Sequence, residues 1–200
     1  MKLSQSRRGF LLAVLAGACL LPIASNAANI IVGTGSDTSY FVLQSTNLGV
    51  RTYEVKYNYN SSVPQDGFFL LDQIRVADSS ISFAINNFGS LLAPNYFVDS
   101  ITFNSVTETG VSAPPFTPYW AQWVSGGAAG FPAASPKPSG TWSFGSGISA
   151  PYRVIAPGSW DALVFSDGSS APSISPIPET SSAALALLGS LVIFKRRRRS

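Results

Sequence analysis

Histidine is absent from this 200-residue chain, and cysteine occurs only once, at Cys19. Histidine is the commonest general base and a frequent metal ligand, so its absence excludes Ser-His-Asp and Cys-His catalysis. Zinc sites built from cysteine and histidine are excluded for the same reason. A chain with a single cysteine also forms no internal disulfide, so the fold depends on a packed core.

Charged residues are scarce as well, at 12% of the chain, and they are placed unevenly. Three basic residues lie within the first eight positions and five lie at the C-terminal end, at Lys195, Arg196, Arg197, Arg198 and Arg199. The stretch between these ends has five basic and ten acidic residues, a net charge of −5. The net positive charge of the whole chain therefore belongs to its two ends, and we expect no nucleic-acid partner.

The first 28 residues predict a secretory signal peptide. A basic start is followed by an apolar stretch at residues 10–23 and by small residues that end at Ala27 and Ala28. We expect cleavage after one of these two alanines. A retained membrane helix is disfavoured because the apolar stretch breaks at Pro22. The paired arginines near the start also fit a twin-arginine signal, so the export route stays open.

The chain ends in three segments of different character. Residues Pro176-Ile177-Pro178-Glu179-Thr180 precede an apolar segment at residues 183–194, and the basic run at residues 195–199 follows. Counted with the two serines before it, the apolar segment would form a helix roughly 21 Å long, shorter than the hydrocarbon core of about 30 Å. It predicts a short transmembrane segment that the basic run holds in place as a stop-transfer signal.

These residues resemble the PEP-CTERM sorting signal of Gram-negative envelope proteins, which are exosortase substrates. The resemblance rests on residues 176–179, on the apolar segment and on the basic run, while Thr180 stands where the family motif has its second proline. It implies an exosortase-type processing enzyme as a partner. It also implies transit through the inner membrane, display at the cell surface or in the extracellular matrix, and an association with exopolysaccharide and biofilm.

Two other interpretations of the C-terminal segments stay open. Residues 177–181 are similar to the sortase motif Leu-Pro-x-Thr-Gly, but Ser181 stands at the glycine, where the backbone must be approached closely. The segment at residues 183–194 would otherwise be the one membrane helix of an inner-membrane protein that faces the periplasm. We favour the PEP-CTERM interpretation because the apolar segment is short and follows the motif closely.

The region between the two signals has the alternation of β-strands. Tyr53, Val55 and Tyr57 fall on one face of residues 52–59, with polar residues on the other. Further strands are expected at residues 40–44, 68–76, 81–86, 96–107, 119–124, 141–144 and 160–165. In the strand at residues 96–107 we expect Phe97, Ile101 and Phe103 to share a face.

We therefore predict one exported all-β domain at residues 29–170. Short strands separated by turn sequences favour an antiparallel β-sandwich or a jelly-roll-like domain. No helix is expected inside it. The signal helix flanks the domain on one side, and a linker at residues 171–175 leads to the short hydrophobic helix on the other.

Aromatic residues lie on both sides of a Gly- and Pro-rich segment at residues 125–139, which predicts a mobile loop. Trp120 and Trp123 are an odd number of positions apart, so they point to opposite faces of a strand. An exposed member of the pair, with Tyr119 or Trp142, is a candidate for stacking on a sugar ring. The alternative is that all of these side chains belong to the core.

The acidic residues offer no strong site. Asp66, Asp72 and Asp78 lie close in sequence but lack the spacing of a calcium loop. Asp66 and Asp161 are an alternative carboxylate pair for a surface glycoside-active enzyme. We assign no catalytic residue, metal ligand or cofactor. The sequence favours a non-enzymatic surface protein with a structural or polysaccharide-binding role.

Overall fold

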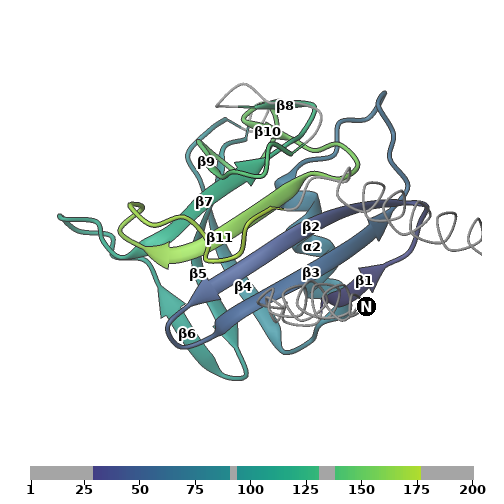
Figure 1. The fold of residues 1–200 in the computed structure, drawn as a ribbon. Helices are drawn as coiled ribbons and strands as arrows, with labels where there is room; N and C mark the ends of the chain where they lie inside the picture. Colours follow the sequence, from purple (N-terminus) through teal and green to yellow (C-terminus); the bar gives the residue numbers. More distant parts are fainter. Residues whose placement is uncertain (1–28, 91–93, 131–137, 177–200) are drawn as a thin grey trace, which may run out of the picture.

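The computed structural model describes residues 29–90, 94–130 and 138–176 (Figure 1). Within them a six-stranded sheet, a three-stranded sheet and a two-stranded ribbon are arranged around one short helix. The elements are β1 (Ile30–Gly33), β2 (Asp37–Ser45), β3 (Gly49–Tyr57), α2 (Gly67–Ala77), β4 (Ile81–Asn87), β5 (Tyr96–Phe103), β6 (Val106–Thr109), β7 (Tyr119–Ser125), β8 (Ala129–Gly130), β9 (Ser143–Phe144), β10 (Arg153–Val154) and β11 (Trp160–Ser166).

The six-stranded sheet has the order β1-β3-β2-β11-β7-β9. Strands β2 and β3 form an antiparallel hairpin. Strand β11 lies between β2 and β7, parallel to the first and antiparallel to the second, and β1 is parallel to β3. The prediction of a purely antiparallel domain is therefore wrong. The β2–β11 pair joins strands from opposite ends of the domain, and alternation within a strand does not report its partner's direction.

The coarse class is as expected, because the described residues are mostly β-sheet with one short helix. The sandwich or jelly-roll type remains a prediction. The signal helix and the hydrophobic helix fall on residues 1–28 and 183–194, which lie outside the described residues. The described part of the chain holds no helix long and apolar enough to cross a membrane.

The main core lies on one face of the six-stranded sheet, which we call the inner face. Phe41 and Leu43 of β2 and Tyr53 of β3 are buried there. Helix α2 and the three-stranded sheet β4-β5-β6 cover this face with Leu70, Leu71, Ile74, Ile81, Val98 and Ile101. Full burial of each such side chain stabilises the fold by about 1.5–3 kcal/mol. We call the opposite face of the sheet the outer face; it carries a separate, smaller cluster around Val42, Trp160 and Ala162.

The segment at residues 68–76 forms helix α2, so its prediction as a strand is wrong. The carboxylate of Asp66 caps the helix by accepting a hydrogen bond from the Phe69 amide at 2.8 Å. Leu70 and Ile74, one helical turn apart, point into the core with Leu71. The run of apolar residues at 68–71 hides this helical spacing in the sequence.

The predicted strand at residues 96–107 is also wrong, because it divides into β5 and β6. Asn104 and Ser105 both have positive φ angles, 48° and 68°, and form a tight turn between the two strands. A register shift in the β4–β5 pairing leaves Phe97 exposed while Ile101 is buried. Phe97, Ile101 and Phe103 therefore do not share a face as predicted.

The Gly- and Pro-rich segment at residues 125–139 is less irregular than expected at its start. Ser125 ends β7, and Ala129 and Gly130 form β8, which pairs with β10. Residues 131–137 lie outside the described residues, so the predicted mobility of this loop remains a prediction.

Candidate functional site

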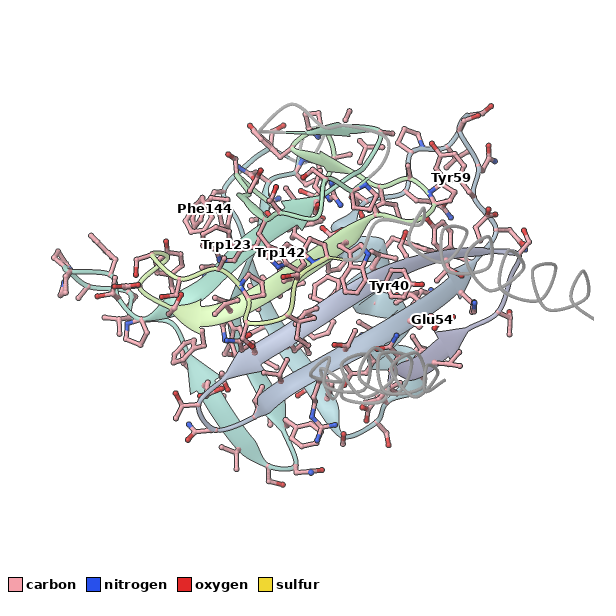
Figure 2. All side chains as sticks on the ribbon, viewed as in Figure 1. Tyr40, Glu54, Tyr59, Trp123, Trp142 and Phe144 are labelled. Carbon is pink, nitrogen blue, oxygen red and sulfur yellow. The ribbon has the colours of Figure 1, made fainter. Side chains whose placement is uncertain are left out.

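The outer face of the six-stranded sheet carries a cluster of aromatic side chains. Its buried members are Val42 of β2 and Trp160 and Ala162 of β11. Tyr40, Trp123 and Trp142 pack against them and are partly buried. Figure 2 shows Tyr40, Trp142, Trp123 and Phe144 following one another across the sheet. This aromatic cluster is separate from the main core.

Trp160 is the centre of the cluster. Tyr40 lies opposite it in the parallel β2–β11 pair, and the two rings are stacked with centroids 4.3 Å apart and planes at 19°. Trp142 meets Trp160 edge to face, at 6.3 Å and 80°. These are favourable aromatic geometries. They fix the orientation of Trp142, which comes from outside the regular strands.

A second aromatic pair extends the cluster toward the edge of the sheet. Phe144 of β9 pairs with Trp123 of β7, and their rings meet edge to face at 5.3 Å and 86°. Trp123 is half-buried and Phe144 is 44% exposed. Tyr119 alternates onto the same face four positions before Trp123, roughly 13 Å along β7. Phe144 is therefore the most exposed of these aromatic side chains, and it lies directly against Trp123.

Trp120 lies on the inner face, which confirms that it and Trp123 point in opposite directions. It is 3% exposed and packs against Phe165 with ring centroids 5.1 Å apart. Its indole N–H donates to the Glu108 carbonyl oxygen at 3.0 Å. The structure thus places Trp120 in the main core, where it has no surface for stacking.

Three buried polar atoms of the outer face have no hydrogen-bond partner within the described residues. They are Nε1 of Trp123, Nε1 of Trp160 and the hydroxyl oxygen of Thr52. Thr52 pairs with Val42 and therefore lies on the same face. A buried polar group without a partner costs about 1–3 kcal/mol. All three atoms lie beneath the surface of the outer face, so a ligand could reach them only if the side chains above them moved.

The predicted linker lies against the outer face. We call residues 171–176 the C-terminal strap; Figure 1 shows the chain turning back after β11 and running along the sheet. The amide and hydroxyl of Ser173 donate to Oε1 of Gln44 at 2.8 and 3.0 Å. The indole N–H of Trp142 donates to the Ile174 carbonyl at 2.6 Å. The strap therefore shares the aromatic cluster.

The charged groups of the outer face compensate each other. Nζ of Lys56 lies 2.6 Å from Oε1 of Glu54 and donates to the Thr38 hydroxyl at 2.9 Å. Glu54 and Lys56 are neighbours on β3, and Glu54 pairs with Tyr40. The charge nearest to the aromatic cluster is thus already neutralised.

The alternative carboxylate pair lies inside the protein. Asp161 is 1% exposed and forms a two-pronged ion pair with Arg153. Asp66 accepts hydrogen bonds from the amides of Phe69 and Ala150 at 2.8 and 3.0 Å. Burial, with a further contribution from Asp161, raises the pKa of Asp66. Asp161 has no surface from which to act on a polysaccharide, and Asp66 is occupied as a helix cap.

The other carboxylates considered for calcium do not converge. Asp72 forms an exposed ion pair with Arg75 at 2.6 Å, and Asp78 accepts hydrogen bonds from Ser80 and Tyr53. Burial acts to raise the pKa of Asp78, but hydrogen bonds donated by Ser80 and Tyr53 together outweigh it, so the pKa is lowered. The described residues contain no group of three or more acidic, histidine or cysteine side chains placed to hold a metal ion.

The structure adds Tyr40, Trp160 and Phe144 to the residues considered from the sequence. All three lie in segments that alternation predicts as strands. Their meeting with Trp123 and Trp142 depends on the β2–β11 and β7–β9 pairings. Tyr40 and Trp160 come from opposite ends of the domain, so a pattern within one strand could identify each as a strand residue but not their contact.

The sorting and cleavage residues lie almost entirely outside the described residues. Pro176 is described and buried. The other residues of this group lie outside the described residues: Ala27, Ala28, Ile177, Pro178, Glu179, Thr180, Lys195, Arg196, Arg197, Arg198 and Arg199.

Comparison with protein-family models, with curated proteins and with solved structures gave no match to this chain.

Proposed function

We propose that this chain is a non-enzymatic surface protein that binds neutral polysaccharide through the outer aromatic face. The signal-like N-terminus and the PEP-CTERM-like C-terminus support export and display at the surface or in the matrix of a Gram-negative bacterium. An exosortase-type enzyme is the expected processing partner. The binding role is carried by one observation, the half-buried Trp123 and Trp142 gathered with the exposed Phe144 on one face of the sheet.

The chemistry of the face favours a neutral sugar polymer over other ligands. Aromatic rings stack on the apolar C–H faces of pyranose rings. Glu54 and Lys56 cancel each other's charge. The region between the two signals, residues 29–175, has a net charge of −4, so it would repel an anionic polymer.

Affinity electrophoresis tests this proposal. The full chain, purified in detergent, would migrate through gels cast with neutral hydroxyethylcellulose or with anionic alginate. We expect retardation by the neutral polymer and its loss in Trp123→Ala, whereas any retardation by alginate through the basic ends of the full chain should be the same in wild type and variant. The matched control is Phe88→Ala, an aromatic residue that is 73% exposed and packs with Phe97, away from the outer face.

Two outcomes would overturn the binding role. One is normal migration of the wild-type chain through the neutral gel. The other is retardation that persists in Trp123→Ala, which would place the contact elsewhere on the molecule.

A further inference from the structure

The C-terminal strap makes the kind of contact that a ligand would make. Three indole groups lie on the outer face, from Trp123, Trp142 and Trp160. Among the described residues, the N–H of Trp142 has an acceptor, the Ile174 carbonyl of the strap at 2.6 Å, whereas those of Trp123 and Trp160 have none. A strap oxygen thus stands where a sugar oxygen would be bound.

Among the described residues, few hydrogen bonds hold the strap. Apart from the Trp142 bond, Ser173 donates twice to Oε1 of Gln44. Residues 171–176 have no regular secondary structure, although Pro172 and Pro176 are buried. Single hydrogen bonds of this type contribute about 0.5–1.5 kcal/mol each. Local opening of such a segment therefore costs far less than unfolding the sheet beneath it.

We propose that the C-terminal strap is a built-in competitor of the polysaccharide, so that the outer face alternates between a strapped state and an open, ligand-bound state. This inference rests on the proposed function, because the competitor must be a ligand of the aromatic face. Because only open molecules bind, the apparent affinity for the polysaccharide equals the intrinsic affinity multiplied by the fraction of molecules in the open state. Weakening the strap raises that fraction without changing the aromatic cluster.

The alternative is that the strap is a fixed part of the fold and that sugar binds beside it. Hydrogen exchange separates the two. In the strapped state the Ser173 amide is protected by Gln44. We expect saturating cellohexaose, a neutral β-glucan fragment, to raise the exchange rate at residues 171–176 of the full chain in detergent. Exchange in the inner core strands should stay unchanged.

A variant gives the complementary test. Gln44→Ala removes both Ser173 bonds and leaves every aromatic residue in place, and we expect it to bind cellohexaose about tenfold more tightly by calorimetry. Gln73→Ala is the control, because Gln73 lies on α2, which covers the inner face. It should bind like the wild type.

The outcomes separate this inference from the proposed function. Unchanged strap exchange on binding, or a wild-type affinity in Gln44→Ala, overturns the competition while the binding role stands. Absence of any binding to cellohexaose and to hydroxyethylcellulose overturns both.

Discussion

The guanidinium of Arg153 donates to both carboxylate oxygens of Asp161, at 2.8 Å through Nε and at 2.6 Å through Nη2. Both side chains are buried, at 2% and 1% exposure. Arg153 also donates to the carbonyls of Gly126 and Trp160. The pair therefore connects β10 to β11 and to the turn after β7.

Asp161→Asn is expected to destabilise the protein by about 3–5 kcal/mol, because it leaves the Arg153 charge buried without its counter-ion. Denaturant unfolding measures the loss. The matched control is Asp72→Asn, which breaks the exposed Asp72–Arg75 pair and should cost less than about 1 kcal/mol. Equal losses in the two variants would show that burial adds nothing to the Arg153–Asp161 pair.

Asp66 gives a prediction of pH dependence. Burial raises the pKa of Asp66 above its ordinary value of 3.8. A carboxyl with a raised pKa binds its proton more tightly in the folded state, so its contribution to stability is full at low pH and is lost as the pH rises through the folded pKa. Asp66→Ser keeps a capping oxygen but does not titrate.

We expect the free energy of unfolding of the wild type, relative to Asp66→Ser, to fall as the pH is raised from about 4 to about 7. Urea unfolding at several pH values checks this, and the contributions of carboxylates that do not interact with Asp66 cancel in the difference. If the free energy of unfolding of the wild type instead rises relative to the variant over this range, folding stabilises the ionised form of Asp66.

The tryptophans should differ in their energetic roles. Trp120→Ala empties a site in the main core and is expected to cost about 3–5 kcal/mol. Trp142→Ala removes a half-buried ring at the strap and should cost less stability than Trp120→Ala. Melting curves of the two variants decide. A Trp142 loss as large as that of Trp120 would make Trp142 a core residue and weaken its role as a stacking surface.

Processing at both ends is expected to leave a mature protein that begins at Ala28 or Asn29 and ends near Glu179. The small residues before the first site and the proline-rich motif at the second site are the reason. The intact mass of material from the cell surface tests both cleavages together. A surface species that still carries residues 195–200 would contradict the processing interpretation.

Replacement of Arg196–Arg199 by serine should release the chain into the medium without C-terminal processing. An apolar helix of roughly 21 Å is a weak anchor without a cationic stop. Fractionation followed by mass measurement distinguishes released, retained and processed chains. Normal retention and processing of the variant would remove the basic run from the sorting mechanism.

Alternation of side chains predicted most of the strands of the main sheet, because β2, β3 and β11 each bury one face in the inner core. It failed at residues 68–76, where a helix buries Leu70 and Ile74 one turn apart. It also failed at Phe97, where a shift in register turns the strand. In each case the missing information was local geometry that a period of two cannot express.

The candidate site was predictable only in part. The odd spacing of Trp120 and Trp123 correctly separated a core side chain from one on the outer face. The stack of Tyr40 on Trp160 depends on the parallel pairing of β2 with β11. The docking of the strap on Gln44 joins two segments that no sequence pattern connects. Contacts between distant strands are set by the whole fold.

The position of β11 also determines when the domain can fold. Strands β2 and β7 are neighbours of β11 on either side, so both keep an open edge until residue 166 has been made. Pairing over such sequence distances is slow, because a long loop must close first. A nascent chain that ends before Trp160 would present two unpaired edges, a template for aggregation. Completion of the sheet is thus one of the last events in the synthesis of this domain.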